Sequence, residues 1–127
     1  ASCSKDDAEE AQPSLLIGKW NQVQTESILP GFPNLIVPYD VNVIGCEKNY
    51  YEFVAGGTTN LVEHYIANNV CKQYIQKGTW SQVGNKFTNN GGTIYTIESI
   101  TNNELKFFYE QNIPTGGIQR TTSTFSR

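Results

Sequence analysis

Apolar and polar residues alternate along several short stretches of this chain, which is the pattern of strands that bury one face. In one such stretch Leu105, Phe107 and Tyr109 share a face, while Lys106 and Glu110 lie on the opposite one. Runs of this kind recur from residue 15 onward and predict a chain built of strands. We expect eight of them, at residues 17–27, 49–54, 58–66, 74–83, 86–88, 93–100, 104–111 and 118–125.

Short connectors rich in glycine and asparagine separate these runs, among them Ala55-Gly56-Gly57, Asn90-Gly91-Gly92 and Thr115-Gly116-Gly117. Such residues accept the positive φ of tight hairpin turns, and strands joined by short turns usually pair with each other. A meander of about eight strands with one buried face can close on itself and enclose side chains or one small ligand. The predicted fold class is therefore all-β, an antiparallel up-and-down barrel, with a two-sheet β-sandwich as the second choice.

One segment interrupts this rhythm between the first two expected strands. Residues 28–45 read "ILPGFPNLIVPYDVNVIG", and the three prolines disfavour a long helix or a central strand. Long apolar loops are uncommon, because their side chains need something to cover them. We expect this segment either to plug one end of the barrel or to gate access to a ligand.

Length and charge narrow the class of protein further. The chain has 127 residues, enough for one domain, and its 9 basic and 12 acidic residues give a net charge of −3. This balance argues against a nucleic-acid partner, which would require clustered lysine or arginine. Apolar runs stay far below the roughly 20 residues that span a bilayer. The polar start, "ASCSKDDAEEAQPS", predicts a tether over residues 1–14, followed by a barrel domain over residues 15–127.

Catalytic and metal-binding patterns are weak in this sequence. The single histidine, His64, follows Glu63, whose side chain points to the opposite face of a strand, so the two cannot act together as acid and base. A zinc site formed by His64, Cys46 and Cys71 would lack a fourth ligand. We therefore expect no enzyme activity, no cofactor and no metal site.

Three cysteines leave one unpaired if the other two form a disulfide. Cys46 and Cys71 lie just before and just after a predicted hairpin, so their positions should be neighbours. We expect a bond between them, worth about 3–4 kcal/mol in the chain-entropy model and stable only outside the reducing cytosol. Cys3 would then be the free cysteine.

The segments "IGKWNQV" (residues 17–23) and "KGTWSQV" (residues 77–83) nearly repeat each other. In each, a glycine precedes a tryptophan by two residues, so Gly18 with Trp20, and Gly78 with Trp80, share a strand face. A glycine lets another part of the protein approach closely, and an indole can fill the end of a barrel. Both tryptophans are expected to serve mainly in packing.

The first of these motifs, followed by the meander, resembles the lipocalin and wider calycin pattern. The ensemble of "YYEF", "AGGT", "KGTWSQVGNKFT" and "IYTIESITNNELKFFY" with two cysteines resembles the lipocalin-like domains of Bacteroidetes lipoproteins, from Leu15 to Arg127. The resemblance implies a barrel floor at Gly18 and Trp20, with Trp20 the more deeply buried tryptophan. It also implies an arginine stacked on Trp20, for which Arg120 and Arg127 are the candidates.

The beginning of the chain carries a second resemblance. "ASC" is similar to the end of a bacterial lipobox, and "SKDD" after it is similar to the signal that sends Bacteroidetes lipoproteins to the cell surface. This implies a lipid on Cys3 and membrane attachment through it. The expected location is the outer membrane, exposed at the cell surface, with its periplasmic face as the alternative.

Two functions are compatible with such a barrel. The first is binding of a small hydrophobic or amphipathic ligand in the open end, because aromatic rings with polar tips suit such a molecule. The second is a protein- or glycan-interaction module with a filled barrel and the exposed loops "ILPGFPNLIVPY" and "QNIPTGG". An interior void favours the first. The residues expected to contact a ligand are Tyr51, Phe53, Tyr65, Tyr95, Phe107 and Tyr109.

Overall fold

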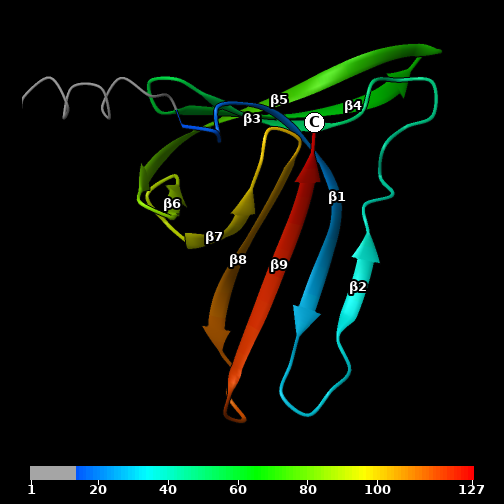
Figure 1. The fold of residues 1–127 in the computed structure, drawn as a ribbon. Helices are drawn as coiled ribbons and strands as arrows, with labels where there is room; N and C mark the ends of the chain where they lie inside the picture. The colour runs from blue at the N-terminus through cyan, green and yellow to red at the C-terminus, as the bar shows by residue number, and fades with distance from the viewer. Residues whose placement is uncertain (1–13) are drawn as a thin grey trace, which may run out of the picture.

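The computed structural model describes residues 14–127, and strands are the only regular secondary structure in that range (Figure 1). The predicted strands all form, most of them within two residues of the expected ends. In chain order the strands are β1 (Gly18–Ile28), β2 (Leu35–Pro38), β3 (Tyr50–Val54), β4 (Thr58–Ala67), β5 (Val70–Val83), β6 (Lys86–Asn89), β7 (Ile94–Ile100), β8 (Glu104–Asn112) and β9 (Ile118–Ser126).

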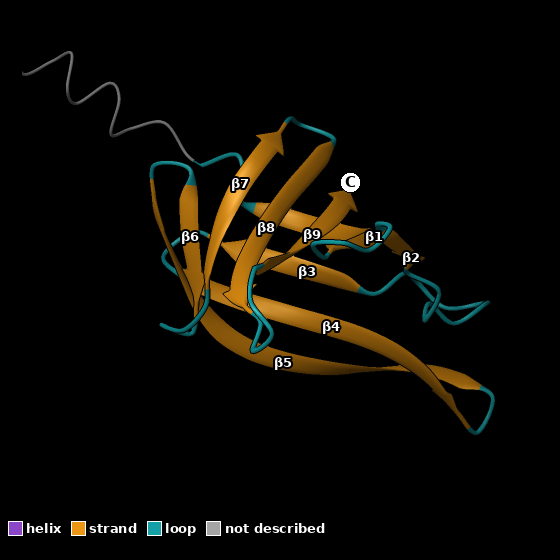
Figure 2. Ribbon diagram, turned by 90° about the horizontal axis from the view of Figure 1, so that it is seen from below, coloured by secondary structure: helices purple, strands orange, loops and turns teal. Residues whose placement is uncertain are grey.

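Strand β1 closes the barrel by pairing with two strands that lie far apart in sequence. Its first three residues pair with β3, and the rest of its length pairs antiparallel with β9. From β3 to β9 each strand pairs with the next, so eight strands form a closed ring. Figure 2 shows these strands from below. This confirms the predicted all-β antiparallel barrel over the second choice, a sandwich.

The ninth strand, β2, was not predicted and corrects the interpretation of residues 28–45 as one long loop. Gln24 to Ser27 of β1 pair with β2, on the edge that β1 offers beyond its short contact with β3. A four-residue edge strand tolerates Pro38 as its last residue, because no neighbour needs its missing N–H. All four side chains of β2 are exposed, so this part of the segment does not plug the barrel.

The β4–β5 hairpin is also longer than expected at its turn. Asn68 and Asn69 have φ values of 53° and 63°, and Ala67 pairs directly with Val70. Asparagine tolerates this left-handed conformation better than most residues, so two residues suffice for the turn. The hairpin therefore extends beyond β3 and projects from the barrel (Figure 2).

The predicted disulfide is confirmed. Cys46 and Cys71 are bonded, with 5.7 Å between their Cα atoms. Cys46 belongs to the loop before β3, and Cys71 lies on β5 opposite Ile66. The bond thus fastens that loop to the projecting half of the β4–β5 hairpin.

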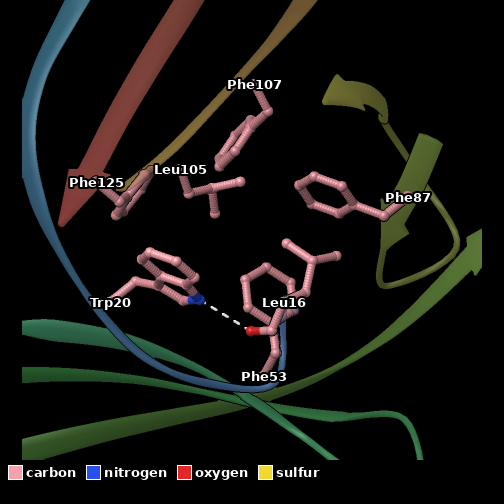
Figure 3. Close-up of a cluster of buried hydrophobic side chains, with 7 residues drawn as sticks. All are labelled: Leu16, Trp20, Phe53, Phe87, Leu105, Phe107 and Phe125. Atoms are coloured by element: carbon pink, nitrogen blue, oxygen red, sulfur yellow. Dashed lines mark hydrogen bonds between the residues drawn. The ribbon is translucent and has the colours of Figure 1, made fainter. Parts of the chain in front are cut away.

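Aromatic and aliphatic side chains from both sides of the barrel form one core cluster (Figure 3). The cluster includes Leu16, just before β1, and we call this end of the barrel its closed end. Trp20 is fully buried, and its Nε1 donates a hydrogen bond of 2.8 Å to the carbonyl oxygen of Leu16. Phe53 meets Phe87 edge to face, with 5.5 Å between ring centroids. Trp80 is only partly buried at the margin of this cluster, so Trp20 is the deeper of the two tryptophans.

Of the two candidate arginines, Arg127 is the one that covers Trp20. Its guanidinium carbon lies 3.7 Å from the centroid of the Trp20 ring, and Nη1 donates to the carbonyl oxygen of Ile17 at 2.9 Å. A Cβ at Gly18 would lie 2.6 Å from the same Nη1, so only glycine leaves room for the arginine. Arg120 instead forms an ion pair with Glu110 at 2.9 Å.

The chain enters the described structure at the closed end of the barrel. Ser14 Oγ donates a hydrogen bond of 2.6 Å to Oε1 of Gln82, and the carbonyl oxygen of Leu15 accepts one from Arg127 Nη2 at 3.0 Å. The tether was predicted over residues 1–14. Of these, only Ser14 is among the described residues, and Cys3 lies outside them. In the described part of the chain, no helix has the length and apolarity needed to cross a membrane.

Candidate functional site

A cavity of about 260 Å³ lies inside the barrel, next to the core cluster. Strands β1, β3, β4, β6, β7, β8 and β9 contribute to its wall, and so does the segment that follows β2. Its lining residues are Gln22, Tyr39, Asn49, Tyr50, Tyr51, Leu61, Asn89, Tyr95, Phe107, Tyr109, Ser123 and Phe125.

Aromatic rings in mutual contact form much of this wall. The ring of Tyr95 meets those of Phe107 and Tyr109 edge to face, with centroid distances of 5.1 Å and 5.7 Å. Phe107 stacks on Phe125 at 5.3 Å. Edge-to-face and offset contacts are the favourable geometries for aromatic pairs. The wall is thus held by its own packing and presents apolar ring surface with phenol groups to the cavity.

Four of the six residues expected to contact a ligand lie in this wall. Their contact with a ligand stays a prediction. They are Tyr51, Tyr95, Phe107 and Tyr109.

The other two expected ligand residues, Phe53 and Tyr65, do not line the cavity. Phe53 is 1% exposed and lies in the core cluster, where it meets Trp80 and Phe87 edge to face. Tyr65 is 46% exposed, because it lies on the part of β4 that extends beyond β3. The alternation of the strands gives the face of each residue correctly but not its depth along the barrel axis.

Asn49 is a buried polar residue that joins the loop before β3 to two strands. Its backbone N–H donates to Asn42 Oδ1 at 2.8 Å, and its Nδ2 donates to the Tyr39 hydroxyl at 3.0 Å. Its Oδ1 accepts from the backbone N–H of His64 at 2.7 Å, and its carbonyl oxygen accepts from Asn21 Nδ2 at 3.0 Å. Asn49 therefore holds Tyr39 at the cavity and fixes the loop on which both residues lie.

Sequence reasoning missed the polar part of the wall. Three of the missed polar residues are Gln22, Asn89 and Ser123. Strand alternation could have found them, because each lies two positions from a core aromatic residue, respectively Trp20, Phe87 and Phe125. Tyr39 and Asn49 come from the irregular segment between β2 and β3, for which no such periodic signal exists.

Burial raises the pKa of two phenols in the cavity wall. It raises the pKa of Tyr51 above the ordinary value of 10.0, against a smaller lowering by a hydrogen bond to Thr59, and the nearby Tyr95 adds to the rise. The pKa of Tyr95 is also raised, mainly by burial and then by Tyr109. Among the described residues that line the cavity there is no aspartate, glutamate, lysine, arginine or histidine.

A comparison with protein families gives this arrangement a context. The model of a family described as "Lipocalin-like domain" matches residues 16–107, which run from the start of the core cluster into β8. The chain belongs to this lipocalin-like family. No curated protein matches this lipocalin-like domain.

The structure is also similar to several solved structures, at low sequence identity and with TM-scores below 0.5. A deswapped triple mutant of bovine odorant-binding protein is 20% identical, with a TM-score of 0.44, over 90% of this chain and 74% of that protein. The complex of bovine odorant-binding protein with undecanal is 18% identical, with a TM-score of 0.43 and coverage of 92% and 75%. A dog lipocalin allergen is 15% identical, with a TM-score of 0.40 and coverage of 88% and 73%.

The lipocalin-like domain has a second hollow, of about 340 Å³, on its surface beside the disulfide. His64 lies there with its side chain 7% exposed, and its Nε2 is 3.9 Å from Oε2 of the exposed Glu47. Across residues 14–127, no group of three or more His, Cys, Asp or Glu side chains is placed to hold a metal ion. The backbone N–H of His64 donates a hydrogen bond to Oδ1 of Asn49, which belongs to the loop before β3.

Proposed function

We propose that this lipocalin-like domain binds one small, partly apolar molecule in the barrel cavity. The observation that carries the proposal is a cavity of about 260 Å³ whose described wall consists of aromatic rings, one leucine and the polar groups of serine, amide and tyrosine side chains, with no acidic or basic residue. Ligand sites are typically apolar hollows with a few placed polar groups. A molecule of liquid water occupies ~30 Å³. If each non-hydrogen atom of a ligand takes a similar volume, the cavity has room for on the order of ten of them.

The cavity favours ligand binding over an interaction module with a filled barrel. A filled interior would be packed at the density of a core and leave no void of this size. Membership in the lipocalin-like family agrees with binding rather than catalysis. Pro30 and Gly117, one from each loop of the alternative, lie against each other at the far end of β1 and β9, and of these two loops only Tyr39, the last residue of the first, lines the cavity.

Filling the cavity tests the proposal. Ser123 lines the cavity from β9 and is half-buried, so Ser123→Phe places a ring in the space that a ligand needs. We expect wild-type protein to bind toluene and benzyl alcohol, measured by calorimetry or ligand-observed NMR, and Ser123→Phe to weaken both at least about tenfold, the equivalent of 1.4 kcal/mol.

Ser81→Phe is the matched control, because it makes the same change at an exposed position of β5. It should bind both probes as wild type does, and circular dichroism should confirm that all three proteins are folded. Binding of neither probe to wild type, or equal binding by Ser123→Phe, would refute ligand binding in this cavity.

We propose further that the domain is a lipoprotein anchored through a lipid on Cys3, in the outer membrane and exposed at the cell surface. The support is the sequence "ASC" and the lysine-and-acid run that follows it. The closed end of the barrel, where Ser14 binds Gln82, is the end at which such an anchor would join the domain. The cavity then lies on the other side of the core cluster from the membrane attachment.

A further inference from the structure

Strand β2 is an edge strand with one free side. Among residues 14–127 it pairs only with β1, and Figure 1 shows no strand on its other side. All four of its residues, Leu35–Pro38, are exposed. A free edge of this kind presents unpaired backbone N–H and C=O groups to which another strand can bind.

The hydrogen bonds to β1 show which backbone groups of β2 are free. The N–H of Tyr39, just after β2, donates to the carbonyl oxygen of Val23 at 2.9 Å and continues the register of β2 with β1. Hydrogen-bonded and non-bonded positions alternate along an antiparallel pair. Val37 therefore directs its backbone groups toward β1, whereas Ile36 and Pro38 direct theirs to the free side. That side offers both groups of Ile36 and the carbonyl oxygen of Pro38, which has no N–H.

The free side of β2 lacks the charges that usually protect an edge. Exposed edges commonly carry lysine or another charged residue, which disfavours pairing with a second chain. The open edges of the β4–β5 hairpin follow this rule, with Glu63 on β4 beyond β3, and Lys72 and Lys77 on β5 before its contact with β6. Strand β2 reads "LIVP" instead, and its three aliphatic side chains are between 51% and 60% exposed.

We propose that two copies of this domain associate by antiparallel pairing of β2 with β2, about a two-fold axis at Ile36. Each Ile36 then exchanges two backbone hydrogen bonds with Ile36 of the second copy. Pro38 lies opposite Asn34 of the second copy, whose N–H has no backbone acceptor among the described residues and can donate to the Pro38 carbonyl oxygen. In this register no N–H is required from proline. The association does not depend on ligand binding in the cavity.

The charges beside β2 are compatible with a second copy as the partner. Asp40, two positions after β2, lies opposite Phe32 of the second copy, so the two Asp40 residues are eight positions apart along the paired strands, about 26 Å at 3.3 Å per residue. Glu26 pairs with Ile36 in the sheet and accepts a hydrogen bond from Asn34 Nδ2 at 3.2 Å. Three strand spacings of ~4.8 Å separate the two copies of Glu26. Both distances exceed the screening length of about 8 Å at physiological salt.

The small size of the contact predicts a weak association. The pair of β2 strands is four residues long, and Phe32, which is 69% exposed, adds apolar surface three positions before it. Contacts smaller than a standard interface are typical of transient complexes, so we expect a dissociation constant between about 10 μM and about 1 mM.

Sedimentation velocity over a concentration series tests this association. The full chain carries Cys3→Ser for this experiment, so that Cys3 cannot link two copies through a disulfide. We expect monomer at low concentration and a reversible dimer as the concentration rises. Amide hydrogen exchange, followed by NMR, should slow at Ile36 as the dimer forms, because its N–H then has an acceptor. A chain that stays monomeric up to about 1 mM would overturn the proposal.

Two substitutions at one position separate strand pairing from apolar contact. Ile36→Pro removes the N–H that faces the second copy and keeps the bonds between β1 and β2, so the dimer should weaken at least about tenfold for the two hydrogen bonds lost. Ile36→Thr is the matched control, because it removes apolar surface but keeps the N–H and the β-branched side chain, and we expect a change within about threefold. Equal weakening by both variants contradicts strand pairing.

Tyr74→Thr is the control for the other open edge, because Tyr74 is 58% exposed on β5. It should leave the dissociation constant unchanged. A dimer lost in Tyr74→Thr and kept in Ile36→Pro would assign the contact to the hairpin and refute the role of β2. Circular dichroism at low concentration reports whether each variant folds. Should Ile36→Pro fail to fold, Ile36→Lys places two like charges opposite each other and should also weaken the dimer at least about tenfold. An unchanged dimer in Ile36→Lys would equally refute pairing at β2.

Discussion

Trp20 and Trp80 stand in nearly identical sequence motifs, and in each motif the glycine makes room for a polar side chain. A Cβ at Gly18 would meet Arg127, and a Cβ at Gly78 would lie 2.5 Å from Asn90 Oδ1. The two indoles differ in depth. Trp20 has no exposed surface, whereas Trp80 is partly buried and donates its Nε1 hydrogen bond to Val54 at 2.9 Å. The two copies of the repeat thus form the same local arrangement of glycine, tryptophan and a polar side chain, one deep in the core and one nearer the surface.

This difference in depth predicts different costs of truncation. Trp20→Ala removes a fully buried side chain from the centre of the core cluster and takes away the ring on which Arg127 stacks. We expect it to lower the free energy of unfolding by about 3–5 kcal/mol, a large share of the ~5–15 kcal/mol typical of a domain. Trp80→Ala should cost less, because that ring is already partly exposed.

Urea unfolding of both variants measures these costs. Should Trp20→Ala fail to fold, Trp20→Phe provides a milder truncation that still removes the Nε1 bond to Leu16. A larger loss for Trp80→Ala than for Trp20→Ala would contradict the assignment of Trp20 to the floor of the barrel.

At the scale of elements, the sequence reveals the strands of the ring better than the segments between them. Strands such as β8 alternate clearly because one face is buried, so their sequence carries a period of two. Strand β2 reads "LIVP" and has all four side chains exposed, so its sequence shows no alternation of apolar and polar residues from which it could be predicted. It exists because β1 is longer than its partner β3 and leaves an edge free, which is a property of the closed sheet.

The disulfide is the element-scale feature with the clearest energetic consequence. Cys46 and Cys71 are 25 positions apart, and the bond closes a loop that includes β3, β4 and the turn to β5. In the chain-entropy model, replacing both cysteines by serine should lower the free energy of unfolding by about 3–4 kcal/mol. The loop before β3 keeps its bonds through Asn49, so the native β-sheet should persist.

Urea unfolding with and without a reductant gives the measurement. The reductant should shift the wild-type midpoint down to that of Cys46→Ser/Cys71→Ser and leave the double variant unchanged. Since Cys71 is exposed, a reductant can reach the bond. An unchanged wild-type midpoint in the reductant would argue against any stabilising role for the disulfide.

At the scale of the whole molecule, the aromatic character of the cavity could be predicted, but the depth of each inward-facing residue along the barrel could not. Tyr51, Tyr95, Phe107 and Tyr109 follow from the inner faces of strands. Which inner residue lies in the cavity and which in the core depends on the stagger of all the strands around the ring. That stagger is set by closure between β1 and β9, which pairs residues about 100 positions apart and leaves no local trace in the sequence.

The placement of the two ends of the barrel bears on how the molecule would meet a membrane. Residues 14–17 lie at the closed end, held by Gln82 and Arg127, and the cavity lies on the other side of the Trp20 layer. An anchor on Cys3 would therefore attach at the closed end and leave the cavity free to exchange ligand with the surroundings.

Fractionation of the native host, expressing the protein from its own gene, tests this anchor. Wild-type protein should appear in the membrane fraction, and Cys3→Ala should move it to the soluble fraction, because the lipid that holds it is then absent. Cys46→Ser/Cys71→Ser, which removes the disulfide and keeps Cys3, should remain with the membrane. Protease added to intact cells should digest the wild type if it lies on the cell surface and spare it if it faces the periplasm. Wild-type protein in the soluble fraction, or Cys3→Ala retained in the membrane, would rule out a lipid anchor at this cysteine.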